Sequence, residues 1–349
     1  MKKLIISLML CALLLAGCVF AQHPTTEAPT VPDGAHLTVH FIDVGQADCA
    51  LLECGGEYMI VDGGNVDDSS LVVSYLEKQG VQELEAVVCS HAHEDHVGGL
   101  PGVLAVYPTK AVYAPTKTYS SKCFDDFVYY TDQQRLEITI PSPGDSFMLG
   151  EATVTILGPT QSYADPNDTS IILMVQFGET KFLFTGDMET GAENDMLDYW
   201  GENFDWHADV LKVGHHGSET STSYRFLRAV MPTYGVISVG EGNSYGHPHE
   251  LPMSRLEDAG VVLYRTDELG TVIAASDGKT VTFTWEDTSH QPQDPTQGST
   301  VTEFIGNKNS KTLHLPSCSS LPKEENRVVF HDYDEAIAQG YKPCSRCLE

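Results

Sequence analysis

The feature that most constrains this chain is a run of metal-binding side chains at the end of an apolar segment. His91, His93, Asp95 and His96 follow the apolar residues 84–89, which predict a buried strand. Two histidines at i and i+2 of an extended segment project toward one point, and the next two ligands are displaced toward a second. Imidazole nitrogen with carboxylate oxygen suits zinc, manganese or iron, and a coordination position left to water makes such a site catalytic. A solvated histidine-rich loop is the alternative, but the run follows a core strand and has no low-complexity character.

The segments around this run predict an α/β domain. Strands are expected at 36–44, 50–53, 58–61 and 84–89, and a second strand-rich half at 170–177, 181–184, 210–213 and 235–239. Helices are expected at 69–78, 190–200 and 223–230, where the apolar residues recur with helical spacing. Two strand-rich halves interleaved with helices predict two sheets packed face to face with helices outside, an αββα sandwich.

Five further short motifs occur around the histidine run in a fixed order. They are Phe41-Ile42-Asp43-Val44-Gly45-Gln46, Ile60-Val61-Asp62-Gly63-Gly64, Phe184-Thr185-Gly186-Asp187, Val213-Gly214-His215-His216-Gly217-Ser218 and Tyr245-Gly246-His247-Pro248-His249. With the HxHxDH pattern of His91–His96, this series resembles the metallo-β-lactamase superfamily and, within it, the extracellular domain of the ComEC group. The resemblance covers residues 36–286 and implies a dinuclear hydrolase.

Carried over residue by residue, the resemblance implies a role for each position that matches a motif of the family. Asp187 is expected to bridge two cations, although an isolated Gly-Asp could be only a turn. His216 is expected to complete the second metal site, with His215 as the alternative ligand or a substrate partner. Asp62 is expected to brace the site by hydrogen bonds.

Two residues are expected to take part in proton transfer. Asp95 is both a candidate ligand and a candidate proton-transfer group. His247, in a loop flanked by glycine and proline, suits a phosphate contact or a general acid; a loop histidine with no such role is the alternative.

The first metal site departs from the wider superfamily. Many members place a further histidine before the bridging aspartate, and this chain has no histidine between His96 and His207. Asn167 or Asp168 is expected to substitute, or the first site is weaker. Oxygen in place of nitrogen would shift metal preference toward manganese. A plain Asn-Asp turn that opens a strand is the alternative.

The expected activity is hydrolysis assisted by two divalent cations, zinc or manganese, since bound cations lower the pKa of water from about 15.7 toward 7. The ComEC resemblance favours a phosphodiesterase or nuclease, with DNA as a possible partner. Hydrolysis of a non-nucleotide ester, a lactone or a β-lactam is the second interpretation. The third is a non-enzymatic surface receptor that binds or takes up DNA. The net charge of −29 acts against long polyanions at long range.

The N-terminus predicts export and lipid anchoring. Met1-Lys2-Lys3 precedes an apolar run that ends in Leu15-Ala16-Gly17-Cys18, which resembles the lipobox of bacterial lipoproteins. Residues 1–17 are the expected signal peptide, Cys18 the lipidated residue, and 18–35 a flexible tether. A plain signal peptide cut elsewhere is the alternative. The expected location is the outer side of a bacterial membrane, with acyl chains as the only membrane contact.

A second small unit is expected at residues 301–349, after a linker at 287–300. His314, Cys318, Cys344 and Cys347 form two close pairs that suit a closed tetrahedral zinc site in a unit too small for its own core. A disulfide is the alternative, but it would leave one of three cysteines unpaired. The segment is similar to the metal-binding domain of the Ada DNA-repair protein. His314 replaces one of that family's four cysteines, which argues against methyl transfer and for a structural or docking role.

Two further expectations concern the remaining cysteines and the local charge. Cys49, Cys54, Cys89 and Cys123 lie in apolar segments and are expected to be buried free thiols. A basic group at the C-terminal end could contact nucleic acid, although a solvated surface explains it equally well. This group comprises Lys308, Lys311, Lys342 and Arg346.

Overall fold

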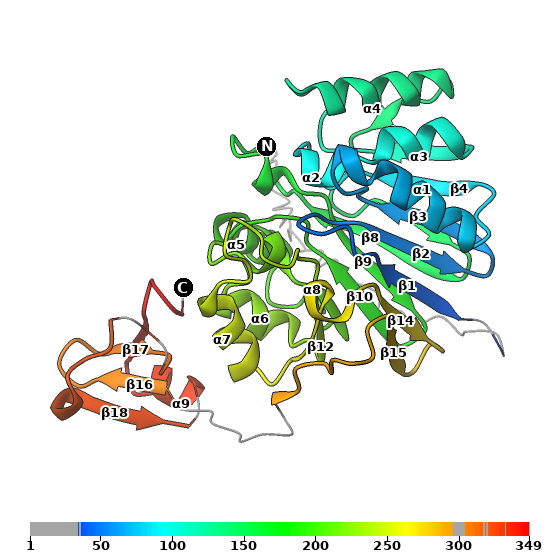
Figure 1. Ribbon diagram of the computed structural model, residues 1–349. Coiled ribbons are helices and arrows are strands. Elements are labelled where there is room, and N and C mark those ends of the chain that lie inside the picture. The colour runs from blue at the N-terminus through cyan, green and yellow to red at the C-terminus, as the bar shows by residue number, and fades with distance from the viewer. Residues whose placement is uncertain are drawn as a thin grey trace, which may run out of the picture.

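A computed structural model describes residue 34 and residues 36–295, 304–316, 318, 320–331 and 333–348. The predicted signal peptide, Cys18 and all of the predicted tether except Gly34 lie outside these ranges. Figure 1 shows a large unit built on two stacked sheets and a small unit that contains β16, β17, β18 and α9. Within the described ranges, none of the helices combines the length and the apolar character that crossing a membrane requires.

The first sheet of the large unit has eight strands in the order β15-β14-β1-β2-β3-β4-β5-β6. Its first three strands along the chain pair antiparallel, whereas β3 to β6 run parallel. The bounds are β1 Leu37–Phe41, β2 Ala50–Cys54, β3 Glu57–Val61, β4 Leu84–Val88, β5 Thr109–Tyr113, β6 Ile138–Thr139, β14 Val272–Ser276 and β15 Val281–Trp285.

The second sheet has seven strands in the order β13-β12-β11-β10-β9-β8-β7. Here β7 to β10 pair antiparallel and β10 to β13 run parallel, so the two sheets share one plan. The bounds are β7 Ser146–Leu149, β8 Ala152–Gly158, β9 Ile172–Phe177, β10 Thr180–Phe184, β11 Val210–Lys212, β12 Tyr234–Ile237 and β13 Val262–Arg265.

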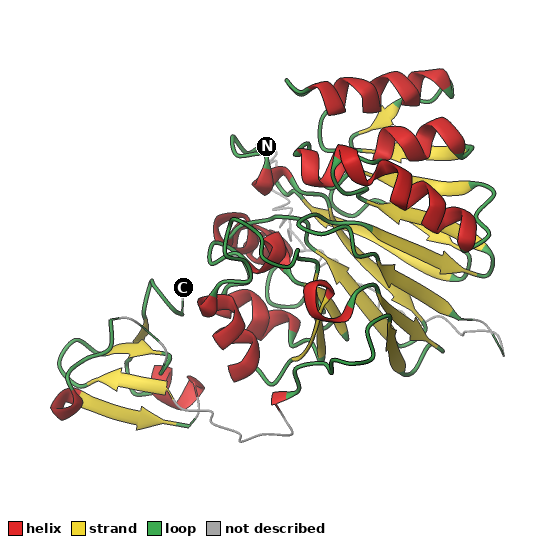
Figure 2. Cartoon of the chain, viewed as in Figure 1, coloured by secondary structure: helices red, strands yellow, loops and turns green. Residues whose placement is uncertain are grey.

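Helices cover the outer faces of both sheets (Figure 2). The first sheet carries α1, α3 and α4, and the second carries α5, α6 and α7. The bounds are α1 Ser69–Lys78, α2 Glu94–Val97, α3 Leu100–Val106, α4 Lys122–Gln133, α5 Thr190–Trp200, α6 Tyr224–Val230, α7 Glu250–Asp258 and α8 Thr266–Leu269. The described residues also include short 3-10 turns: η1 Val66–Asp68, η2 Asn167–Thr169, η3 Gly214–Gly217 and η5 Glu324–Asn326.

Along each strand the apolar side chains point alternately to the two faces of the sheet, and together they form three apolar layers. Leu37, Val39 and Phe41 of β1 enter the apolar layer between the sheets, which also takes Phe182 and Phe184 from β10. Residues of the opposite parity, such as Leu51, Ile60 and Val87, pack under the first helix layer. Each fully buried side chain of this size stabilises the fold by about 1.5–3 kcal/mol. This is the predicted αββα sandwich.

The small unit has a four-stranded sheet in the order β18-β16-β17-β19 and one helix. Its apolar core includes Phe304, Leu313 and Phe330 together with three cysteines, Cys318, Cys344 and Cys347. The bounds are β16 Phe304–Asn307, β17 Thr312–His314, β18 Arg327–Phe330, β19 Lys342–Pro343 and α9 Tyr333–Ala338.

Residues 287–295 of the predicted linker lie against the large unit, where Gln293 forms a two-way backbone bridge with Leu263 of β13. Residues 296–300 lie outside the described ranges.

Candidate metal centre

The histidine run lies at the carboxyl end of β4. The strand ends at Val88, and the backbone amide of Ser90 donates to Asp62 Oδ1 at 2.7 Å, which fixes the start of the loop. His91 Nε2 lies 3.1 Å from His93 Nδ1, so these two imidazoles converge on one point. The chain then turns into α2, which displaces Asp95 and His96 from that point.

Asp187 follows β10 in the other sheet and lies between the two groups of ligands. Its Oδ1 is 3.2 Å from His96 Nε2, and its Oδ2 is 3.9 Å from His91 Nε2. The tight approach depends on Gly186, whose φ is +49° and where an added Cβ would lie 2.7 Å from the hydroxyl of Ser170. That hydroxyl also accepts the backbone N–H of Asp187 at 3.0 Å.

His216 completes a second cluster with Asp95, His96 and Asp187, whose ligand atoms all lie within 4.8 Å of one another. Its Nε2 is 3.4 Å from Asp95 Oδ2 and 3.7 Å from Asp187 Oδ2. The turn after β11 aims this ring inward, because His215 and His216 both adopt positive φ, 50° and 52°. Such strain in non-glycine residues is concentrated at functional sites.

His215, the alternative ligand, lies at the rim. Its side chain is 21% exposed, against 2% for His216, and its Nε2 is 3.6 Å from Asp187 Oδ2. Its Nδ1 faces outward, toward Thr220 Oγ1 at 3.3 Å and Glu189 Oε1 at 3.6 Å. The geometry therefore favours His216 as the ligand and leaves His215 available to substrate.

Hydrogen bonds orient the ligand nitrogens. His216 Nδ1 lies 2.9 Å from the carbonyl oxygen of Ser238, and His96 Nδ1 lies 2.9 Å from Asp62 Oδ2. A carbonyl only accepts, so His216 Nδ1 carries a proton, and Nε2 is the nitrogen that faces the cluster and would bind a cation in exchange for its own proton. A ligating histidine that gives its other N–H to a carboxylate or carbonyl is the usual arrangement around protein-bound metals. Asp62 thus has the bracing position that the sequence predicts.

The charges of the centre are strongly coupled. Burial raises the pKa of Asp187, but the imidazoles of His96 and His216 outweigh it and hold that pKa well below its usual range. Burial lowers the pKa of His216, yet Asp187 and Asp48 raise it to about 10. In contrast, burial and His96 hold the pKa of His91 well below its usual value. A neutral imidazole at His91 is the form that binds a cation.

The donor set fits divalent cations. In the described part of the chain nine buried side-chain atoms have no hydrogen-bond partner, and five of them belong to candidate ligands or to residues beside them: His96 Nε2, His216 Nε2, Asp187 Oδ1, Asn167 Oδ1 and Asp48 Oδ1. Unsatisfied buried polar atoms are costly and rare, and an ion is one of the few things that explain a group of them. His91, His93 and Asp187 would hold one cation, and Asp95, His96, Asp187 and His216 a second.

The two candidates for the missing ligand of the first site differ in their contacts. Asp168 Oδ1 accepts the backbone N–H of Glu189 at 3.0 Å, and Asp168 also lines a cavity between the large unit and the C-terminal module. Asn167 is buried, and its backbone carbonyl oxygen accepts a hydrogen bond from Ser170 Oγ at 2.6 Å. With its side-chain oxygen unpartnered, Asn167 is the better placed of the two.

Sequence reasoning missed a buried ion pair below the centre. Asp48 Oδ2 lies 2.9 Å from Lys212 Nζ, and Asp48 Oδ1 lies 3.3 Å from His216 Nδ1. Both residues of the pair are about 95% buried. The available signals were a lysine inside the apolar strand that leads to His216 and an acid two residues after Gln46.

His247 lies at the outer rim, close to both histidines of the turn. Its ring centroid is 5.7 Å from that of His215 and 6.4 Å from that of His216, and its Nδ1 lies 3.4 Å from Gln46 Nε2. Burial, with neighbouring His249 and His216, lowers the pKa of His247 to about 4. A neutral ring here suits a hydrogen bond to a phosphate oxygen.

A second buried pair clamps the loop that follows His216. Glu193 accepts the backbone N–H groups of Thr222 and Ser223 at 2.5 and 2.9 Å. Arg255 donates from the other side to the carbonyls of Ser221 and Thr222 at 3.2 and 3.3 Å. This loop is therefore held at four backbone groups by two buried side chains.

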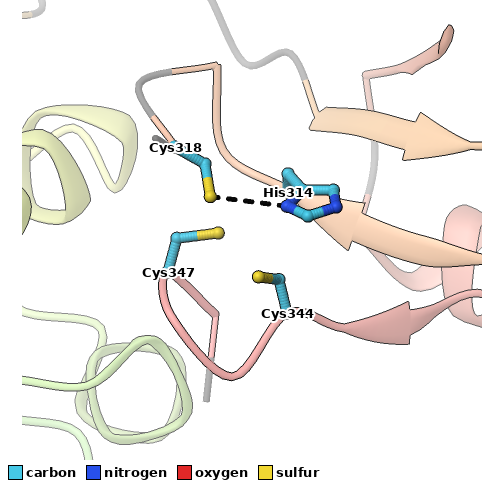
Figure 3. Close-up of side chains that lie close together, drawn as sticks. All are labelled: His314, Cys318, Cys344 and Cys347. Carbon is cyan, nitrogen blue, oxygen red and sulfur yellow. Dashed lines mark hydrogen bonds between the residues drawn. The ribbon is translucent and has the colours of Figure 1, made fainter. Parts of the chain in front are cut away.

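The C-terminal cluster brings together the four residues that the sequence pairs. Figure 3 shows His314, Cys318, Cys344 and Cys347 pointing toward one another, with His314 Nδ1 3.4 Å from Cys318 Sγ. Their ligand atoms lie within 4.8 Å of one another, and all four residues are buried. One histidine and three cysteines in this arrangement form a zinc-type site. Cys49, Cys54, Cys89 and Cys123 are buried free thiols, as predicted.

Comparison with known proteins identifies both units. The profile of the Metallo-beta-lactamase superfamily matches residues 42–241, and that of the metal binding domain of Ada matches residues 296–349. ComE operon protein 3 of Bacillus subtilis is 27% identical over 253 residues, which cover 67% of this chain and 32% of that protein. Competence protein ComA of Neisseria gonorrhoeae is 32% identical over 264 residues, which cover 74% of this chain and 34% of that protein. The chain therefore spans about a third of the length of these relatives.

Proposed function

The chain belongs to the metallo-β-lactamase superfamily and carries a C-terminal Ada-like metal-binding module, and we propose that it is a metal-dependent phosphodiesterase that acts outside the cell. The observation that carries this proposal is the position of Asp187. One carboxylate lies within 4 Å of the Nε2 atoms of His91, His96 and His216, so two groups of ligands share it. A shared carboxylate is what a dinuclear centre requires.

Two divalent cations, zinc or manganese, would supply Lewis acidity and lower the pKa of water. The side chains of this protein supply the rest. His216 and His96 are held in fixed tautomers by Ser238 and Asp62, so their geometry is set before substrate binds. His247 and His215 border the open side and can donate hydrogen bonds to the phosphate and to the leaving oxygen. Asp95, 31% exposed, is the ligand best placed to exchange a proton with substrate.

The competence-protein relatives support a nucleotide-containing phosphodiester, and the proposed lipid anchor at Cys18 would place the enzyme on the outer side of the membrane. Esters, lactones and β-lactams remain chemically compatible with the same centre, and a DNA receptor without activity is the third candidate. The intact ligand set favours an enzyme over a receptor.

The test is a hydrolysis assay on the purified protein with added Mn²⁺ or Zn²⁺. Bis-p-nitrophenyl phosphate, single-stranded DNA and nitrocefin are offered in parallel. We expect turnover of the phosphodiester that His93→Ala abolishes and that His207→Ala, at a half-exposed histidine outside the centre, leaves intact. Turnover of nitrocefin alone would replace the phosphodiester with a lactam, and no turnover of any of the three would favour a receptor.

A further inference from the structure

A cavity lies between the hydrolase unit and the C-terminal module. Its volume is about 920 Å³, within the range of pockets that hold small organic ligands. The module contributes Cys318, Ser345, Arg346 and Cys347. The hydrolase unit contributes the start of α5, the loop after His216 and the start of α7, with Asp168, Glu189, Thr190, Thr220, His249 and Arg255 among the lining residues.

The cavity begins where the rim of the metal centre ends. Glu189 and Thr220 line the cavity, and both lie within 3.6 Å of His215 Nδ1. His249 lines it as well, and its ring centroid is 4.6 Å from that of His247. A substrate whose scissile group lies at the centre would therefore extend past His215 and His247 into this space.

The charges on the walls are unevenly distributed. The hydrolase side presents four carboxylates, those of Asp168, Glu189, Glu219 and Glu250. Of the two arginines on the lining, Arg255 is 2% exposed and donates to backbone carbonyls of the clamped loop. Arg346 belongs to the module and is exposed, so it is the cationic head on this lining that a ligand can reach.

We propose that this cavity is the distal half of the substrate site, and that Arg346 binds one anionic group of a small phosphodiester whose scissile phosphate lies at the metal centre. The inference rests on the proposed phosphodiesterase function. The one reachable guanidinium on the lining can pair with a single further phosphate, and the four carboxylates of the same lining repel a continuous run of phosphates. The module is thus a wall of the substrate site, and the substrate class is a short nucleotide diester rather than a long polynucleotide.

Two chromogenic substrates that differ by one phosphate test this directly. Thymidine 5′-(p-nitrophenyl phosphate) carries only the scissile diester, and thymidine 3′-phosphate 5′-(p-nitrophenyl phosphate) adds one terminal phosphate. We expect the native protein to show a KM about tenfold lower for the second substrate, with a similar kcat, since one charge-assisted pair at a reachable site has an effect of this size. Arg346→Gln should remove the difference in KM, and Arg346→Lys should restore part of it.

The controls separate the proposal from its premise. Arg327→Gln changes a module arginine whose Nε donates to the Pro322 carbonyl and which does not line the cavity, so it should leave the KM ratio unchanged. Zinc content must stay the same in Arg346→Gln, because its neighbour Cys347 belongs to the cluster. An unchanged KM ratio in Arg346→Gln, with both substrates hydrolysed, would overturn the role of Arg346 alone. If neither substrate nor bis-p-nitrophenyl phosphate is hydrolysed, the phosphodiesterase function itself is wrong.

Discussion

The central metal centre and the C-terminal cluster differ in how much of the surrounding fold depends on a cation. The central ligands are imidazoles and carboxylates at the ends of strands whose sheets enclose their own apolar layer. In the module, the ligands Cys318, Cys344 and Cys347 are themselves members of a small core. We therefore expect the central unit to fold around an unfilled centre and the module to depend on its metal. The histidine and carboxylate ligands of the central unit thus suit a catalytic centre, whereas the cysteine-rich ligands of the module suit a structural one.

The largest expected effect is loss of zinc from the module. Cys344→Ser should unfold the module, because zinc binding in such small units contributes about 10–16 kcal/mol to their folding. Hydrogen exchange should show loss of protection in β16 to β18, and zinc content should fall by one equivalent. The hydrolase unit should keep its own unfolding transition. Cys123→Ser, at a buried free thiol outside both sites, serves as the control.

A module that stays protected after this change would remove the contrast between the two regions. It would mean that contacts with α6 hold the module without metal, through the packing of Tyr224 on Phe304 and Tyr333.

The next effect concerns activity rather than folding. Asp187→Asn should lower kcat/KM by about 10³–10⁴, because it removes the carboxylate charge shared by both groups of ligands. The thermal unfolding midpoint should fall by less than the module loses with its zinc, since Asp187 pairs with the buried imidazoles but lies outside the two-sheet core. Asp205→Asn, at an exposed aspartate paired with Lys181, should leave activity unchanged. Unfolding of Asp187→Asn at room temperature would show that the centre stabilises the fold as the module's zinc does.

The turn that carries His216 gives a third, smaller effect. Gly217 has φ +82°, and an added Cβ would lie 2.6 Å from Pro248 Cβ, so Gly217→Ala combines strain with a clash. We expect a loss of about 3–4 kcal/mol in unfolding free energy together with at least a tenfold loss of kcat. Gly191→Ala, where an added Cβ meets nothing within 4 Å, is the matched control for stability and should leave the unfolding free energy unchanged. Equal effects of the two changes would show that this turn tolerates displacement.

Much of the fold and of the candidate site was predictable from the sequence, for reasons that particular residues show. The helices predicted at 69–78 and 190–200 have those bounds as α1 and α5, because their apolar residues follow one face. The histidine run and Asp187 were found because ligands at the carboxyl ends of strands leave a local pattern. The strands β5 to β8 and β13 to β15 were not assigned. For β14 the reason is that its partner β1 lies at the other end of the domain sequence, so no local pattern records the pairing. The choice between His215 and His216 and the Asp48–Lys212 pair also required three-dimensional placement.

The smallest expected effect concerns a histidine that lies outside both the central metal centre and the C-terminal cluster. His40 of β1 is buried, its Nδ1 lies 2.8 Å from Tyr75 Oη, and burial lowers its pKa to about 4. The unfolded chain takes up a proton near pH 6.5 and the folded chain only near pH 4. Stability from this residue is therefore present above pH 6.5 and is lost as the pH falls from 6.5 toward 4, by roughly 2–3 kcal/mol.

Urea denaturation of metal-free Asp187→Asn protein at pH 7 and pH 4.5 measures this loss without a contribution from metal release. His40→Gln in the same background should lose less stability between the two pH values, because glutamine does not titrate. His290→Gln, at an exposed histidine, should leave the loss unchanged. If His40→Gln behaves like the parent, acid acts on the sandwich through the central histidines, and the fold of the large unit is then tied to its metal centre after all.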